Sequence, residues 1–334
     1  MSAPQKSIAR IFRGTPRNLA FLAKRLREGE LVGVPTETVY GLAADALNAR
    51  ACREIFVAKG RPPTDPLIVH IHSLSELAQI AVANPLALKL AKKFWPGPLT
   101  LVLPKTRAVP AVVSAGLPSV AVRMPAHPLF RRLLKLTGRP LAAPSANLFG
   151  YISPTTAEHV RDGLGRKIGY ILEGGAADIG LESTILDLRN PARPRLLRPG
   201  SISRKNLTRV LGQAIAWRGR RSSPSAGAQL APGLLLRHYS PRTPLVLHKR
   251  LTVAQVQRSA PDEAWLFIAR PAGRVRKNMF WLDPRGDLRG AAHRLFAQLR
   301  TLDGAGYLRI HVEQASGEGP ADAINDRLRR AAAR

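Results

Sequence analysis

Two threonine hydroxyls follow a short apolar run near the start of the sequence. The run at 31–35 is typical of a buried strand, and Thr36 and Thr38 come directly after it. Ligands of open α/β sheets bind where strands end, so neighbouring hydroxyls at this position can bind a small polar ligand. Helix capping by either threonine is the competing interpretation.

A lysine and an arginine lie one residue apart in a proline-rich loop. Lys59 and Arg61 precede Asp65 and a strand-like run at 67–71 that contains His70. Two such cations can clamp phosphates, the lysine as a point charge and the arginine as a planar fork. A solvated loop is the alternative for the cations, and a place in the core is the alternative for His70.

A third cluster is an arginine at the end of an apolar run. Arg123 closes the segment that begins at Ser119, and its neighbours are of the kind that become buried. A buried guanidinium needs a partner, because leaving it unpaired is costly. A substrate carboxylate or phosphate would serve, so we expect a binding role for Arg123.

Small polar residues follow the remaining short runs. Ser145 and Asn147 come after the run at 141–143, which ends in Ala143, and Ser153 lies just beyond. Ser183 and Arg198 stand beside two later apolar segments. Turn chemistry alone could explain the serines and the asparagine. Taken together, the clusters predict an anionic small ligand, most simply a nucleotide, in a basic cleft.

Composition gives a second, weaker indication of partners. The chain has 334 residues and a formal net charge of +30, with 40 arginines against 12 lysines. Basic surface attracts nucleic acid. The excess is spread along the chain, at +18 for residues 1–210 and +12 for residues 211–334. A generalised basic surface with weak RNA affinity is therefore the expectation, rather than a dedicated patch.

The single cysteine, Cys52, excludes a disulfide framework and a cysteine-rich zinc site. No apolar run approaches the ~20 residues that span a bilayer, and the N-terminal segment lacks the core of a secretory signal. We expect a cytoplasmic protein that contacts no membrane. The lack of acidic residues before Glu28 leaves a mitochondrial targeting segment as an alternative.

Hydrophobic periodicity predicts two α/β units joined by a linker. In the first unit it predicts helices over 16–27, 50–58, 74–82, 85–94 and 128–136, a capping box at 155–158, and strands over 31–35, 67–71, 99–103, 120–124, 141–143, 170–172, 183–187 and 195–197. In the second it predicts strands over 244–247, 265–269, 279–282 and 308–312, and helices over 252–259, 287–300 and 321–332. Residues 217–229 have linker composition. The expected divisions are 1–212, 213–243 and 244–334.

The combination of motifs resembles the threonylcarbamoyladenylate synthase family, the YrdC-like proteins, in its long two-domain form. The resemblance is carried by segments along nearly the whole chain: PTETVYGL at 35–42, Lys59 and Arg61, FWPGPLTLVL at 94–103, VAVRMPAHP at 120–128, Ser145 and Asn147, LESTILDL at 181–188, LLRPG at 196–200, the linker motif at 231–241 and AINDRL at 323–328. It implies a twisted mixed sheet with helices and a smaller Rossmann-like domain. The long linker would reach over the active site.

The resemblance also implies a reaction. Members of the family condense L-threonine, bicarbonate and ATP to threonylcarbamoyladenylate and pyrophosphate. The product serves a downstream transferase that modifies the adenosine beside the tRNA anticodon. Mg²⁺ would arrive with ATP, bound chiefly through the phosphates.

Site roles follow by the same resemblance. Threonine would be held by Thr36, Thr38, His70, Arg123, Ala143 and Ser183, with Arg123 at its carboxylate. ATP would be surrounded by Lys59, Arg61, Asp65, Ser119, Ser145, Asn147, Ser153 and Arg198. Lys59 and Arg61 would be the catalytic cations. His238 and Tyr239 of the linker would close over the nucleotide, and no protein metal site is expected.

Two other functions compete with this one. In the first, the basic surface binds RNA and the cleft is regulatory or has lost its activity. In the second, the protein is a carbamoyl-transfer enzyme of the hydrogenase-maturation type. The absence of zinc-finger cysteines and of a carbamoyl-phosphate module argues against the latter.

Overall fold

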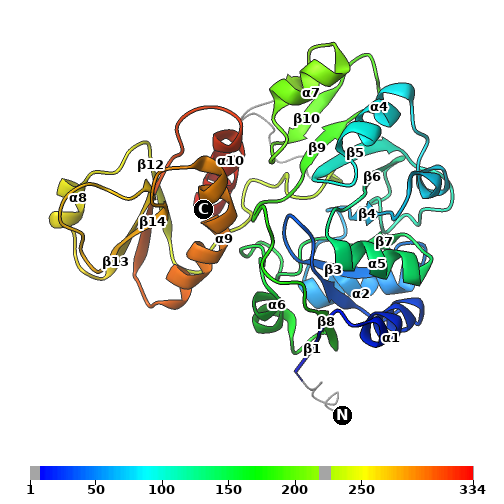
Figure 1. Cartoon of the computed structure of the whole chain (residues 1–334), viewed down its shortest axis with the longest axis horizontal. Helices are drawn as coiled ribbons and strands as arrows, with labels where there is room; N and C mark the ends of the chain where they lie inside the picture. The colour runs from blue at the N-terminus through cyan, green and yellow to red at the C-terminus, as the bar shows by residue number, and fades with distance from the viewer. Residues whose placement is uncertain (1–7, 218–226, 334) are drawn as a thin grey trace.

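The computed structural model describes residues 8–217 and 227–333 of the chain. Residues 218–226, which fall inside the predicted linker, lie outside the described residues. Two α/β units are visible in Figure 1, a larger one built from the N-terminal two thirds and a smaller one built from the C-terminal third. The predicted divisions at residues 212 and 243 stay a prediction.

The larger unit is a mixed sheet covered by helices. Within residues 8–217 eleven strands pair in the order β1-β8-β2-β3-β7-β4-β6-β5-β9-β10-β11. The strands are β1 Arg10–Phe12, β2 Val32–Val34, β3 Gly41–Asp45, β4 Ile68–His70, β5 Leu99–Pro104, β6 Ser119–Arg123, β7 Leu141–Ala142, β8 Tyr170–Leu172, β9 Thr184–Asp187, β10 Arg195–Arg198 and β11 Ala216–Trp217. The helices are α1 Pro16–Arg27, α2 Ala49–Lys59, the 3-10 turn η1 Leu74–Glu76, α3 Leu77–Ile80, α4 Pro85–Phe94, α5 Pro128–Thr137, α6 Ala157–Leu164 and α7 Arg204–Leu211.

The helices begin and end where side chains can satisfy the exposed backbone. Thr15 caps α1 by accepting from the Asn18 amide, and a proline occupies the first turn. α2 ends at Gly60, whose φ of +63° suits glycine. The predicted capping box at 155–158 is wrong. Thr156 is the N-cap of α6 and bonds the amide of His159, so Glu158 does not stand at the third helical position.

The smaller unit has a fully parallel four-stranded sheet in the order β12-β15-β13-β14. Its elements are β12 Leu245–His248, α8 Val253–Gln257, β13 Glu263–Ala269, β14 Met279–Asp283, α9 Leu288–Gly304, β15 Arg309–Glu313 and α10 Pro320–Ala332. Alternating strands and helices with a parallel sheet confirm the predicted Rossmann-like fold. Figure 1 shows α9 and α10 between this sheet and the larger unit.

The core of the smaller unit continues into the larger one. Tyr239 of the linker, together with Val39, Ile152 and Leu181, belongs to the same apolar cluster as the buried residues of α9 and α10. Gly180 makes the close approach possible: a Cβ there would lie 2.2 Å from the carbonyl oxygen of His293 in α9, and its φ is +74°. The two units therefore share a packed apolar interface.

No helix in the parts of the chain that the structure describes combines the length and the apolar composition needed to cross a bilayer.

Candidate functional site

The sheet brings the predicted threonine-side residues together. His70 and Arg123 end β4 and β6, which are parallel neighbours, and the two residues are register partners. Thr36 and Thr38 reach them from the turn between β2 and β3. Ala143 follows β7, and its amide bonds the Ile68 carbonyl of β4.

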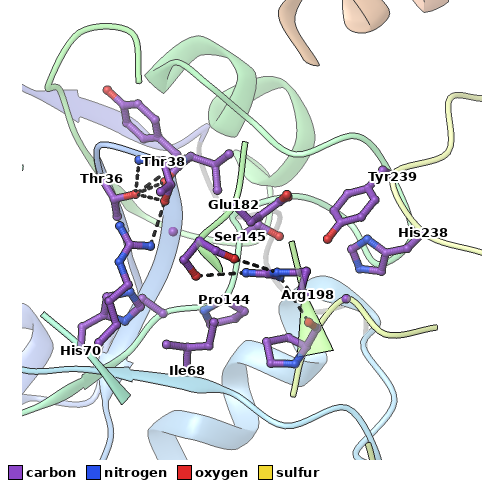
Figure 2. A pocket seen from close by; sticks show the side chains of 18 of the residues that line it. Thr36, Thr38, Ile68, His70, Pro144, Ser145, Glu182, Arg198, His238 and Tyr239 are labelled. Atoms are coloured by element: carbon purple, nitrogen blue, oxygen red, sulfur yellow. Dashed lines mark hydrogen bonds between the residues drawn. The ribbon is translucent and has the colours of Figure 1, made fainter. Parts of the chain in front are cut away.

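The turn that carries the threonines is fixed by its own hydroxyl. Oγ1 of Thr36 donates to the carbonyl oxygen of Val39 at 2.6 Å and accepts from the amides of Thr38 and Val39. This serine/threonine-type turn lies between two strands, so the alternative that either threonine caps a helix is wrong. The turn presents both side chains to the pocket (Figure 2).

Arg123 has a protein partner that the sequence reasoning missed. Its Nη2 lies 2.6 Å from Oε1 of Glu37, and its Nη1 donates to Oγ1 of Thr38 at 2.9 Å. Both charged side chains are buried. The pair satisfies the requirement that a buried charge be compensated, and Arg123 still lines the pocket.

His70 is neutral at physiological pH. Burial, with a smaller contribution from the nearby positive charge of Arg123, lowers the pKa of His70 to about 3. Its Nδ1 is buried without a hydrogen-bond partner. It can therefore act as a polar, uncharged wall of the pocket.

The two predicted cations differ in where they point. Arg61 lines the pocket, donates to the carbonyl of Pro66 at 2.7 Å and pairs with Asp65 at 3.0 Å. Lys59 lies behind the lining, and its Nζ donates to the carbonyl oxygens of Ser145 and Asn147. Burial, and next the charge of Arg61, lower the pKa of Lys59 well below its usual value. Lys59 thus holds the turn whose Ser145 lines the pocket.

Arg198 connects the floor of the site to the linker. It donates to the carbonyl and the hydroxyl of Ser183 at 3.1 and 3.2 Å, and to the carbonyl of Pro232 at 3.2 Å. Figure 2 shows Arg198 in the middle of the pocket, with His238 and Tyr239 approaching from the side opposite His70. The linker therefore forms part of the wall.

The linker residues aim unpaired polar atoms at the cavity. Tyr239 and His238 line it, and Oη of Tyr239 and Nδ1 of His238 are buried without hydrogen-bond partners. Tyr239 has a φ of +63°, a left-handed conformation that is costly for a tyrosine. Buried unpaired polar atoms and local strain are typical of ligand sites.

Four predicted residues besides Lys59 do not line the cavity. Asp65 pairs with Arg61, Asn147 donates to two carbonyl oxygens of its own loop, and Ser153 donates to Glu182. Ser119 begins β6, and its Oγ is buried without a partner. Asp65 and Ser153 support side chains that do line the cavity.

The other residues that line the pocket had no role assigned from the sequence. They are Val39, Tyr40, Gly41, Ile68, Pro144, Glu182, Pro232 and Gly233. Glu182 is the informative one, because it is a buried acid in a pocket lined by Arg61, Arg123 and Arg198. It stands in the LEST segment next to Ser183, which could have drawn attention to it.

The space between these residues amounts to about 500 Å³ when the open solvent at its mouth is counted, and the enclosed part is far smaller. Thr36, Thr38 and His70 lie at one end, where Arg123 bonds Thr38, and His238 and Tyr239 lie at the other, with Arg198 between the two ends. Such a site can hold a small carboxylate at one end and a larger anion at the other, under a cover that limits access of water.

Comparisons with known proteins agree with this geometry. A family model described as "Telomere recombination" matches residues 24–200, and one described as "Threonylcarbamoyl-AMP synthase, C-terminal domain" matches residues 202–333. The threonylcarbamoyl-AMP synthase of Pyrococcus abyssi is 41% identical over 315 residues, which is 92% of this chain and 91% of that protein. The Bacillus subtilis protein of the same name is 46% identical over 69% of this chain and 66% of its own.

A solved structure is similar over the whole chain. The crystal structure of P. abyssi Sua5 complexed with L-threonine aligns with a TM-score of 0.88 at 38% identity, covering 98% of each chain. The resemblance read from the motifs is confirmed by both domain models and by this structure. The chain belongs to the threonylcarbamoyl-AMP synthase family, in its two-domain form.

Proposed function

We propose that this protein is an L-threonylcarbamoyladenylate synthase, a nucleotidyltransferase that uses L-threonine, bicarbonate and ATP. The observation that carries the proposal is one pocket in which Arg123 and Thr38 lie at one end and Tyr239 at the other, with Arg198 between them. An amino acid and a nucleotide can occupy these ends side by side. The likeness to a relative solved with L-threonine bound supports the assignment of the first end.

The proposed reaction balances in two steps. The amine of threonine takes up the carbon of bicarbonate with loss of water, which gives a carbamate. A carbamate oxygen then attacks the α-phosphorus of ATP, the bond from that phosphorus to the bridging oxygen breaks, and pyrophosphate leaves. Positioning and neutralisation of negative charge govern such a transfer, and the arginines of the pocket supply both.

We assign the threonine end to Thr36, Thr38, His70, Arg123, Ala143 and Ser183. In this arrangement Arg123 shares its guanidinium between Glu37 and the substrate carboxylate, since the side chain has five donors. Neutral His70 and the methyl of Ala143 would contact the uncharged part of the amino acid.

We assign the nucleotide end to Arg61, Ser145, Arg198, His238 and Tyr239. The assigned residues behind them are Lys59, Asp65, Ser119, Asn147 and Ser153. Arg61 and Arg198 would neutralise phosphate charge, and Lys59 would fix the Ser145 turn through the carbonyl oxygen that it bonds. The linker would cover the nucleotide and keep water from the labile carbamate and mixed anhydride.

Mg²⁺ would enter with the triphosphate. The carboxylates of Glu37, Asp65 and Glu182 each pair with an arginine, and the described residues contain no cluster of three metal-ligating side chains. This donor set fits a cation held chiefly by phosphate oxygens. When bound, the ion would neutralise charge on the leaving pyrophosphate.

The decisive experiment measures pyrophosphate release with purified protein. We expect release only when threonine, bicarbonate and ATP are all present, and loss of release when any one is omitted. Release that does not depend on threonine would contradict the proposal. We further propose that the enzyme acts in the cytoplasm and that its product serves a tRNA threonylcarbamoyl transferase.

A weak affinity for RNA is a secondary proposal that rests on the net charge of +30. It predicts binding of tRNA that falls steeply as salt rises, without preference for sequence. Tight RNA binding at physiological salt, together with no threonine-dependent pyrophosphate release, would favour the RNA-binding function over the enzyme.

A further inference from the structure

Arg327, on α10 of the smaller unit, is buried against the pocket of the larger unit. Its side chain is 0% exposed. Nε donates to Oε2 of Glu182 at 2.8 Å, and Nη1 donates to the carbonyl oxygen of Pro199 at 2.9 Å and to Oδ2 of Asp326 at 2.8 Å. The guanidinium thus spans from its own helix to the wall of the cavity.

The carboxylate that Arg327 holds faces the substrate space. Glu182 lines the pocket, and its other oxygen accepts from Oγ of Ser153. Because Arg327 and Ser153 each bond one of its oxygens, the carboxylate of Glu182 is held in a fixed orientation. An unpaired carboxylate in this wall would repel a triphosphate, and Arg327 neutralises it from behind.

Arg327 also contacts the cover of the pocket. Its guanidinium carbon lies 5.4 Å from the ring centroid of Tyr239, and the ring of Phe296 in α9 stacks on the same tyrosine at 5.5 Å. Two residues of the smaller unit therefore fix the ring of Tyr239. They hold it although its backbone adopts a left-handed φ.

Stability alone is a weak reason for this arrangement. Burying an arginine costs several kcal/mol of desolvation, and apolar residues of similar volume often stabilise a core as well or better. A buried arginine fork is instead suited to fixing the orientation of a carboxylate and of an aromatic ring.

We infer that Arg327 is a positioning residue for the nucleotide half of the site, through Glu182 and Tyr239. The inference rests on the proposed function and gives the smaller unit a direct part in building the pocket. Arg327 touches none of Arg123, Thr38 and His70, and it approaches the threonine end only through Glu182, the neighbour of Ser183, so we expect a smaller effect on threonine than on ATP.

The test compares Arg327→Lys and Arg327→Met with the control Arg329→Met. Lysine keeps the charge opposite Glu182 but lacks the planar fork. Arg329 lies on the same helix, and within the described residues its side chain donates only to the carbonyl of Asn325 in its own turn. Thermal unfolding, the Kd for threonine, the KM for ATP and kcat are measured for the full chain.

For Arg327→Lys we expect a folded protein, a threonine Kd within about twofold of wild type, and a KM for ATP raised about tenfold or more. Arg327→Met should show a larger rise, and Arg329→Met none. A wild-type KM and kcat in Arg327→Lys would overturn the inference. So would equal losses in threonine and ATP binding, because these indicate general loosening of the fold.

A failure of the inference can be told apart from a failure to fold and from a failure of the proposed function. If Arg327→Met does not fold, Arg327→Lys decides the question alone. If wild-type protein releases no pyrophosphate, the proposed function fails, and calorimetry with a non-hydrolysable ATP analogue then tests positioning. Equal affinity of wild type and Arg327→Lys for the analogue would overturn the inference.

Discussion

The guanidinium of Arg123 lies 2.6 Å from the carboxylate of Glu37, and both side chains are buried beside the pocket. A buried ion pair of this kind is hard to break from one side, because the remaining charge has no compensation. The pair also leaves donors of Arg123 for a second carboxylate. Stability and substrate binding can therefore be separated at this position.

Arg123→Met should lower the free energy of unfolding by about 3–5 kcal/mol, since it leaves Glu37 buried and unpaired. The double variant Arg123→Met/Glu37→Gln removes both charges and should recover most of that loss. Neither variant should bind threonine with measurable affinity. Urea unfolding and calorimetry check the two expectations. Threonine binding by the double variant would show that Arg123 does not hold the substrate.

Arg61→Lys tests the nucleotide end while keeping a charge opposite Asp65. A lysine ammonium can replace Nη2, which contacts Asp65 Oδ2 and the carbonyl of Pro66, but it has no counterpart of Nε, which donates to the carbonyl of Asp65 at 2.9 Å. We expect a folded protein with a KM for ATP raised on the order of tenfold and threonine affinity near wild type. Arg53→Lys, on the exposed face of α2, is the matched control and should resemble wild type. Unchanged ATP kinetics in Arg61→Lys would remove Arg61 from the site.

Tyr239→Phe should change stability and activity in opposite directions. The hydroxyl of Tyr239 is buried without a hydrogen-bond partner, so its removal should stabilise the fold by about 1 kcal/mol. If the hydroxyl contacts the nucleotide, the same change raises the KM for ATP. Thermal unfolding and pyrophosphate release measure the two effects. A stabilised variant with wild-type kinetics would mean that the hydroxyl has no substrate contact.

The sequence predicted the elements well where side-chain pattern decides the local structure. α1 and α4 begin and end as predicted, because a capping side chain, a proline in the first turn and an amphipathic face coincide in each. β3 was not predicted. Its sequence, Gly-Leu-Ala-Ala-Asp, has no β-branched or aromatic residue, and its pairing with β2 and β7 makes it a strand.

The site was predicted less completely because its charge pairs are distant in sequence. The sequence indicated that Arg123 needs a negatively charged partner, and a substrate was expected to provide it. In the structure Glu37 already provides part of the compensating charge. Glu182 and Arg327 are separated by 145 residues and by a domain boundary. Local patterns carry no information about such contacts, which depend on how the strands are ordered and how the units dock.

Acid should destabilise the protein through His70. Its pKa is lowered to about 3 in the fold, mainly by burial and also by Arg123, while the unfolded side chain titrates near 6.5. The unfolded state therefore binds the proton first, and this contribution to stability is present above pH 6.5 and is lost as pH falls toward 3. His70→Gln should reduce the slope of unfolding free energy between pH 6.5 and 5 by up to about 1.4 kcal/mol per pH unit. His72→Gln, at a partly exposed neighbour, is the control, and an unchanged slope in His70→Gln would contradict the expectation.

Alanine substitutions at Gly180 and Gly175 distinguish the cost of backbone strain from the cost of disrupting the contact between the two units. Both have positive φ, +74° and +76°, but a Cβ at Gly180 meets the backbone of His293 at 2.2 Å, whereas nothing lies within 4 Å of one at Gly175. Gly175→Ala should cost only the conformational penalty, roughly 1–2 kcal/mol. Gly180→Ala adds the clash, so it should separate α9 from the larger unit and release Tyr239 from Phe296. We expect faster proteolysis and a higher KM for ATP in Gly180→Ala only. If the two variants behave alike, contact between the units does not control the nucleotide end.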